Sequence, residues 1–276
     1  MKSGLLIFLL VISNIFVFRE AVKNQNEISV SFLDVGQGDS SLIRSEGIDL
    51  LIDTGPRKNV LYELTHVIPK TDRYIDLIVI SHPHADHFGG LEYVLSDYDV
   101  GAIITSGSET EKEFNAVLNK ARDKNIPVIN FFAGSSVKTK LLELEIVYPP
   151  KGTPEEKLKD NDGSLVIFAS IGELNGLFPG DITRKSEAVI SAINFPETDF
   201  LKVPHHGSAT SSSDGFLSAI NPLVAVISVG QNSYGLPKEE TIKKFTDRGI
   251  PVFRTDDTGG VKIEKNRGKL RVKSID

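Results

Sequence analysis

Four residues that can bind a metal ion fall within six positions, in the stretch HPHADH that begins at His82. His82 ends an apolar run, and Pro83 favours an extended conformation at the residue before it. Residues two apart in an extended chain point the same way, so His82 and His84 can share one ion. Asp86 and His87 lie where the chain is expected to enter a helix, and they can face a second ion. Imidazole and carboxylate ligands together suit zinc, manganese or iron, and this interpretation is favoured over a solvated polar turn.

Further candidates lie at the ends of other apolar runs. Asp181 completes a Pro-Gly-Asp sequence, where its carboxylate needs a partner, although a simple turn aspartate is the alternative. His205 and His206 are adjacent, and in an extended chain they would point opposite ways, so both can hardly bind one ion directly. Asp53 is expected to accept a hydrogen bond from a ligand histidine, or else to cap a strand.

These residues need a scaffold of many short strands. Apolar and β-branched runs predict strands, and apolar residues at helical spacing predict helices. Strands are expected at 28–35, 41–45, 48–55, 75–82, 100–107, 127–133, 141–149, 164–171, 176–182, 199–206, 223–230, 251–256, 260–265 and 270–275, and helices at 59–69, 85–98, 111–125, 183–193, 213–220 and 238–249. Residues 149–163, rich in Pro, Gly and charge, are expected to form a loop inside the domain. Two similar halves, each strands then helices, favour two packed sheets with helices outside.

Composition narrows the possible functions. The chain has 276 residues, 40% of them hydrophobic and 25% charged, as in an ordinary globular domain. Its formal net charge of -6 argues against tight nonspecific adhesion to nucleic acid, but not against an enzyme that visits a polyanion. The absence of cysteine excludes disulfides, thiol nucleophiles and cysteine-bound zinc.

The N-terminal segment is expected to direct export. Lys2 precedes an apolar run over residues 4–18, which is short for a membrane-spanning helix and suitable for a signal-peptide core. Residues 1–19 are therefore interpreted as a signal peptide or N-terminal membrane anchor, 20–27 as a tether and 28–276 as the folded domain that carries the candidate metal ligands. A buried N-terminal helix is the alternative. The domain is then expected outside the cytoplasmic membrane, secreted or anchored to it.

The motifs as a set resemble a known superfamily. HPHADH followed by GG, together with LIDTG, LFPGD and VPHHGS in that order, resembles the metallo-β-lactamase superfamily. More narrowly, FLDVGQGDS, NDGSLVI, VPHHGSATSS and TDDTGG are similar to the hydrolase domain of ComEC-type DNA-uptake competence proteins and their free-standing relatives. The resemblance implies an α/β (α+β) fold, a four-layer αββα sandwich of two mixed sheets with helices outside, and two metal ions at the strand ends.

The resemblance also implies roles for individual residues. His82 and His84 would hold the first ion, Asp181 would bridge the two, and His205 is favoured over His206 as the histidine that completes the second site. His206 would then either support a ligand from behind or donate a proton, and Asp86, Asp181 and His206 would be the catalytic residues. Gln37, Asp39 and Ser208 would bind substrate. The remaining second-ion ligands would be Asp86 and His87. The first site has no third histidine, so Asn161, Asp162 or a water is expected to fill that position. In NSYGLP, Leu236 stands where similar proteins often have histidine, which puts a substrate-binding or proton-transfer role there in doubt.

The expected function is metal-dependent hydrolysis. Two divalent ions, zinc or manganese, can activate water and stabilise an in-line attack on a phosphodiester. A phosphodiesterase or nuclease acting transiently on DNA, and tethered by its N-terminus to the cytoplasmic membrane, is the favoured hypothesis. The alternatives are an esterase for another substrate, such as a cell-wall phosphoester, a β-lactamase, and a non-catalytic binding module.

Overall fold

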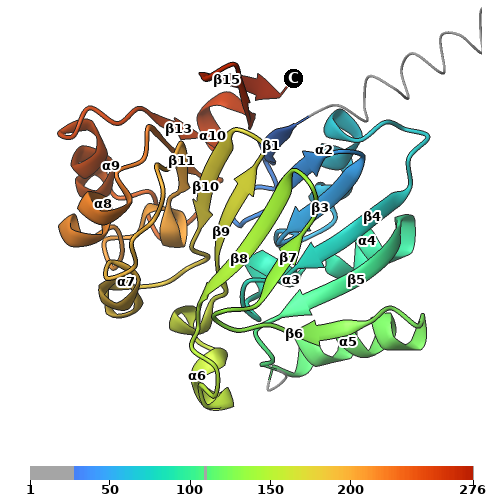
Figure 1. Cartoon of the computed structure of the whole chain (residues 1–276). Helices are drawn as coiled ribbons and strands as arrows, with labels where there is room; N and C mark the ends of the chain where they lie inside the picture. The colour runs from blue at the N-terminus through green and yellow to red at the C-terminus, as the bar shows by residue number, and fades with distance from the viewer. Residues whose placement is uncertain (1–27, 109–110, 276) are drawn as a thin grey trace, which may run out of the picture.

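The computed structural model describes residues 28–108 and 111–275, and these form two packed β-sheets with helices on the outer faces (Figure 1). The expectations for residues 1–27 lie outside the described part. The first sheet has the order β15-β14-β1-β2-β3-β4-β5-β6 and the second β13-β12-β11-β10-β9-β8-β7. The αββα sandwich expected from the sequence is therefore confirmed.

The first sheet contains eight strands: β1 (Ser29–Phe32), β2 (Ser41–Ser45), β3 (Ile48–Ile52), β4 (Tyr74–Val79), β5 (Asp99–Thr105), β6 (Val128–Asn130), β14 (Gly260–Asn266) and β15 (Lys269–Ile275). The second contains seven: β7 (Ser136–Lys138), β8 (Leu142–Tyr148), β9 (Val166–Ile171), β10 (Leu174–Phe178), β11 (Phe200–Lys202), β12 (Val224–Ile227) and β13 (Val252–Arg254).

The α-helices are α2 (Asn59–Val67), α3 (Ala85–Phe88), α4 (Leu91–Asp97), α5 (Lys112–Asp123), α6 (Glu155–Leu158), α7 (Arg184–Ile190), α8 (Asp214–Ile220), α9 (Glu239–Thr246) and α10 (Thr255–Thr258). The described residues also contain two 3₁₀ turns, η1 (Asn161–Gly163) and η2 (Pro204–Gly207). The expected loop at 149–163 thus contains the short helix α6 and the turn η1, whose glycine packs directly on the backbone of Leu158.

Continuous apolar strands explain the layers. In β3, Leu50 packs between the two sheets, whereas the next residue, Leu51, packs under the outer helices. In β9 the same alternation separates Ile167 from Phe168. Successive side chains of a strand point to opposite faces, so a strand covered on both sides needs apolar residues at every position.

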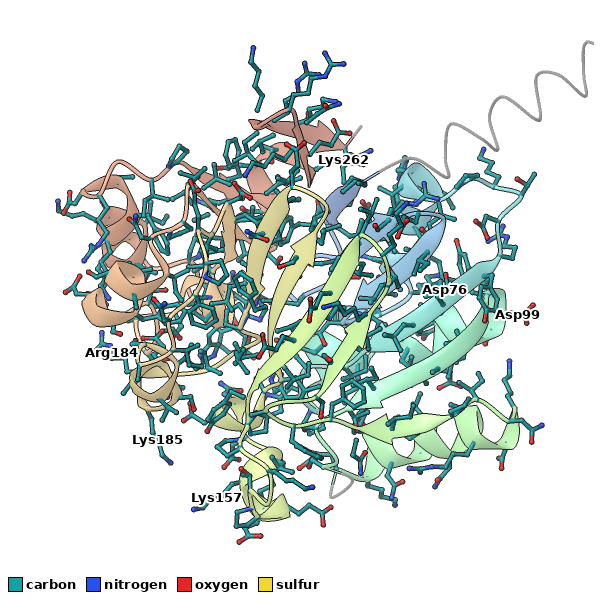
Figure 2. All side chains as sticks on the ribbon, in the orientation of Figure 1. Asp76, Asp99, Lys157, Arg184, Lys185 and Lys262 are labelled. Carbon is teal, nitrogen blue, oxygen red and sulfur yellow. The ribbon has the colours of Figure 1, made fainter. Side chains whose placement is uncertain are left out.

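Helices seal the two outer faces. Apolar residues of α2, α4 and α5, including Leu64, Val94 and Phe114, pack on the first sheet. Phe216 of α8 and Phe245 of α9 do the same on the second. Charged side chains such as Asp99, Lys157, Arg184 and Lys185 lie at the outer surface (Figure 2). Within residues 28–108 and 111–275, no helix has both the length and the apolar character needed to cross a membrane.

Strand direction places the polar residues together. β3 and β4 pair in parallel in the first sheet, and β10, β11 and β12 pair in parallel in the second. Parallel strands end at the same edge of their sheet, and their carboxyl ends are the usual position of a site in such sheets. Asp53, His82, Asp181 and the two adjacent histidines all follow the carboxyl end of one of these strands.

Candidate metal centre

Four side chains from both halves of the chain form a compact cluster, the metal quartet, made up of Asp86, His87, Asp181 and His206. One ligand atom from each lies within 4.8 Å of the others. Nε2 of His206 is 3.2 Å from Oδ2 of Asp86 and 3.4 Å from Oδ2 of Asp181. Nε2 of His87 is 3.3 Å from the same oxygen of Asp181. Two imidazoles thus converge on one carboxylate oxygen, the arrangement expected around a divalent cation.

Asp53 and Ser81 orient the imidazole of His87. Nδ1 of His87 lies 2.9 Å from Oδ2 of Asp53, whose other oxygen accepts from the Ser81 backbone N–H at 2.7 Å. The Ser81 hydroxyl also donates to Oδ2 of Asp53 at 2.8 Å. A carboxylate that accepts from Nδ1–H leaves the Nε2 lone pair free for an ion. Asp53 therefore occupies the position that the sequence predicted for it, behind a candidate ligand.

A left-handed turn aims His206 into the quartet. His205 and His206 have φ values of 52° and 50°, so the extended chain expected through both histidines is wrong. β11 ends at Lys202, and η2 then turns the chain. Nδ1 of His206 lies 2.8 Å from the Ser228 carbonyl, to which it can donate, and this leaves Nε2 facing Asp86 and Asp181.

His205 does not join the quartet. Its Nε2 lies 3.3 Å from Nδ2 of Asn161, and its Nδ1 lies 3.2 Å from Oγ1 of Thr210. The sequence analysis favoured His205 over His206 as the metal ligand, but it is the imidazole of His206 that lies beside Asp86 and Asp181. His205 is only partly buried and lines the groove above the quartet.

His82 and His84 form a second group beside the quartet. Their ring centroids are 4.4 Å apart, and the centroids of His82 and His87 are 4.1 Å apart. His82 is buried, and burial, with His87 beside it, lowers the pKa of His82 well below its ordinary value. A neutral imidazole is the form that binds a metal. The structure thus keeps the two histidines adjacent, as the extended HPH segment predicts.

Asn161 and Asp162 lie in different environments. Asn161 lines the groove, and its Oδ1 is buried without a hydrogen-bond partner among the described residues. Both carboxylate oxygens of Asp162 instead accept from the Thr183 hydroxyl, at 3.0 and 2.9 Å, at the start of α7. Ser186 also donates to Asp162 at 2.9 Å. Asp162 is therefore engaged by the start of α7, which leaves Asn161 or a water for the third position on the first ion.

Lys202 is a buried member of the site that sequence reasoning missed. It is 2% exposed, forms an ion pair with Asp39, and lies 3.5 Å from Oδ1 of Asp181. It also donates to the Gly180 carbonyl at 3.2 Å. Burial lowers the pKa of Lys202, but the Asp39 and Asp181 carboxylates outweigh burial and raise it. The sequence does contain a signal for this residue, because Lys202 is the single lysine in the apolar segment FLKV. It lies two residues after Phe200 and therefore on the same inner face of the strand.

The loop around Gly38 lies partly behind the quartet. Asp39 is 4% exposed and contacts Lys202 and His206, which corrects its expected place at the substrate surface. A Cβ on Gly38 would lie 2.3 Å from the Asp86 carbonyl oxygen, so only glycine fits this approach. Gln37 and Ser208 do line the groove, as expected.

Buried polar atoms test whether this site suits metal ions. Nε2 of His82, Nε2 of His87 and Oδ1 of Asp181 are buried and make no hydrogen bond with any residue of the described chain. Such atoms are costly unless a ligand satisfies them. The donor set, nitrogen and carboxylate oxygen without sulfur, fits zinc or manganese.

The electrostatics of the quartet also suit a cation. Burial alone would lower the pKa of His206, but the carboxylates of Asp181 and Asp39 raise it to about 10. Burial would raise the pKa of Asp181, but His206 and His87 hold it well below the ordinary value. The carboxylates are therefore negatively charged and the imidazoles hold protons in the metal-free site. A divalent ion can bind there by displacing the protons from the imidazoles.

The quartet opens onto a groove of about 930 Å³. Its walls carry Phe88, Glu111, Lys112, Lys159, Tyr234 and Lys238 above the metal-binding residues. A cavity of this size lies within the range of ligand-binding sites in proteins.

A sandwich of this kind, with imidazole and carboxylate ligands at the ends of its strands, is the architecture of a metal-dependent hydrolase. The chain belongs to the metallo-beta-lactamase superfamily, whose family model matches residues 33–231.

Two curated relatives support the narrower resemblance to ComEC-type proteins. ComE operon protein 3 of Bacillus subtilis (strain 168) is 28% identical over 265 residues, which cover 88% of this chain and 34% of that protein. Competence protein ComA of Neisseria gonorrhoeae is 28% identical over 274 residues, covering 96% and 36% respectively. The chain spans about a third of the length of these two relatives.

A solved structure shows the same fold. The metallo-beta-lactamase fold protein YhfI from Bacillus subtilis aligns with a TM-score of 0.56 at 12% sequence identity, covering 89% of this chain and 100% of that one.

Proposed function

We propose that this protein is a two-metal phosphodiesterase that cleaves DNA outside the cytoplasmic membrane. The observation that carries the proposal is the convergence of His87 and His206 on Asp181, beside the pair His82 and His84, beneath an open groove. Two neighbouring ligand groups fit two ions. When bound, such ions supply an activated water and stabilise charge on the phosphorus oxygens during in-line displacement.

Each residue has a definite part in this scheme. His82 and His84, with Asn161, would hold the first ion, and Asp86, His87 and His206 the second. Asp181 is proposed to hold both: its Oδ2 lies beside the two imidazoles of the second ion, and its Oδ1 is buried without a hydrogen-bond partner among the described residues, which leaves that oxygen for the first ion. Asp53 fixes the tautomer of His87, and the Ser228 carbonyl fixes that of His206.

His205 is the candidate proton donor. It lines the groove rather than the quartet, and Thr210 and Asn161 hold its ring on both sides. A group in this position can transfer a proton to the departing oxygen, since general acids must lie within hydrogen-bond reach of the reacting atoms. The expected roles of the two adjacent histidines are thereby exchanged.

DNA is proposed as the substrate for two reasons. The relatives with 28% identity are a competence protein and a product of the comE operon, and the groove, of about 930 Å³, has lysine side chains on its walls. The apolar run after Lys2 supports export and contact with the cytoplasmic membrane. A cell-wall phosphoester remains the second candidate, since the same ligands would activate water for it.

An activity screen tests this function. The purified full chain, reconstituted with Mn²⁺ or Zn²⁺, is incubated with DNA, bis-p-nitrophenyl phosphate, a teichoic-acid-type polymer and a β-lactam. We expect cleavage of DNA and bis-p-nitrophenyl phosphate, and its loss in Asp181→Asn. Hydrolysis of the teichoic-acid-type polymer or the β-lactam without cleavage of DNA would overturn the proposal.

A further inference from the structure

One aromatic ring stands exposed at the wall of the groove. Tyr234 is 72% exposed, more than any other large hydrophobic side chain in the described part of the chain, and it lines the cavity that contains Asp86, Asp181 and His206. An isolated exposed aromatic residue needs no explanation, but one that lines a polar ligand site provides a flat contact surface there.

The loop that carries this ring is held by one asparagine. Oδ1 of Asn232 accepts from the backbone N–H groups of Tyr234 and Leu236, at 3.1 and 3.0 Å. Its Nδ2 donates to the carbonyls of Gly230 and Leu236, at 2.8 and 2.9 Å. Gly235 follows with a φ of 65°, which favours glycine. These bonds fix the backbone beneath Tyr234 while leaving its ring in solvent.

The same loop is attached directly to the metal-binding turn. The Lys238 N–H donates to the Gly207 carbonyl at 3.0 Å. A Cβ on Gly207 would lie 2.6 Å from Cβ of Pro237, so the two segments are in close contact. Gly207 follows His206 in the sequence. The backbone that carries Tyr234 is therefore held in a fixed position relative to the quartet.

Electrostatic attraction along the groove is limited. Lys112, Lys159 and Lys238 line it, but so do Glu111, Glu113 and Asp160. The amine of Lys238 donates to the Tyr234 carbonyl at 2.8 Å, which places one positive charge beside the ring. A groove of mixed charge on an acidic chain needs another source of affinity for a polyanion. Stacking of bases on aromatic rings supplies such affinity without sequence preference.

We infer that Tyr234 is a stacking platform for an unpaired base of single-stranded DNA, and that it positions the neighbouring phosphodiester over the metal quartet. This inference rests on the proposed function, because the strand must enter the groove to be cleaved. A paired base has its faces covered by its neighbours in the duplex, so the platform favours a single strand or a frayed end.

The test compares two substrates that differ only in their bases. The full chain is assayed on a single-stranded oligodeoxynucleotide and on a strand of the same length with abasic sites at every position. The enzymes are the unmodified protein, Tyr234→Ala, Tyr234→Phe and Tyr62→Ala. Tyr62 is a matched control because it is 66% exposed, lies on α2 and does not line the groove.

We expect the unmodified protein to prefer the ordinary strand about tenfold in kcat/KM, mainly through KM, within the range reported for base–aromatic stacking. Tyr234→Ala should remove this preference, and Tyr234→Phe should keep it. Tyr62→Ala should match the unmodified protein. A preference that is unchanged in Tyr234→Ala would overturn the inference, as would a loss in Tyr62→Ala of the same size. If the unmodified protein cleaves neither of the two strands nor bis-p-nitrophenyl phosphate, the proposed function is overturned instead.

Discussion

Nε2 of His206 lies 3.2 Å from Oδ2 of Asp86, a contact between residues 120 positions apart in the sequence. Asp86 lies in the first turn of α3, which follows β4 of the first sheet, and His206 lies in the turn after β11 of the second. The quartet therefore exists only when the two sheets are packed. Metal binding should in turn stabilise the packed sandwich, because an ion that binds only the folded state shifts the folding equilibrium.

Asp181→Asn should remove the shared carboxylate with little change in shape. Two divalent ions repel strongly at short range in a partly dehydrated site, and the carboxylate offsets that repulsion. We expect the metal content to fall from two equivalents towards one, and the phosphodiesterase rate to fall at least about a hundredfold. Elemental analysis and initial rates measure the two effects. Asp162→Asn is the control, since Asp162 contacts Thr183 and Ser186, and it should retain both ions.

His205→Ala and His206→Ala should separate the roles of the adjacent histidines. His206→Ala removes a ligand from the quartet, so one metal equivalent should be lost together with activity. His205→Ala should keep two equivalents and still lower kcat, by about a hundredfold if His205 acts as the general acid. Loss of metal in His205→Ala, with normal metal content in His206→Ala, would restore the assignment expected from the sequence.

Metal affinity should rise with pH. The pKa of His87 is raised well above its ordinary value and that of His206 to about 10, because nearby carboxylates outweigh burial. Both imidazoles therefore hold protons near neutral pH, and an incoming ion must displace them. Titration calorimetry in buffers of different ionisation enthalpy should show proton release on binding of Mn²⁺. An affinity independent of pH between 6 and 8 would show that the metal-free imidazoles are already neutral.

Much of the fold followed from one-dimensional patterns. Runs such as IDLIVI predicted strands covered on both faces, and β4 is such a strand, with Ile75 and Ile78 under the helices and Leu77 and Val79 between the sheets. His82, His84, Asp86 and His87 were identifiable because packing gives no reason to gather four such residues at a strand end.

The rest of the site depended on tertiary structure. Both His205 and His206 adopt positive φ values, which non-glycine residues rarely do unless their surroundings impose them, so no local pattern predicted the turn. The role of Lys202 depends on Asp39 and Asp181, which approach it from different sheets and lie far from it in the sequence. Asp162 shows the opposite case. Its motif made it a candidate metal ligand, but in the structure its carboxylate accepts a hydrogen bond from Thr183 at the start of α7.

Export of the N-terminal segment is testable without the enzyme. Lys2 and the apolar run over residues 4–18 should direct translocation. A fusion of residues 1–26 to a reporter that is active only after export should give activity in a bacterial host. Replacement of Leu9 and Leu10 by arginine should abolish it, because charges interrupt the apolar core. Reporter activity confined to the cytoplasm would contradict the proposed location.

Lys202→Met should destabilise the folded protein strongly. The substitution removes the buried Lys202 cation from the carboxylates of Asp39 and Asp181, which are both less than 5% exposed, and leaves only the imidazoles of His87 and His206 beside them. Breaking one partner of a buried ion pair costs about 3–5 kcal/mol of the free energy of unfolding. Lys243→Met is the matched control, because Lys243 pairs with Asp247 at 2.7 Å on the surface, and such pairs contribute about 0–1 kcal/mol. Denaturant unfolding of the metal-free proteins measures both values. Equal losses in the two variants would show that Lys202 does not compensate the buried carboxylates.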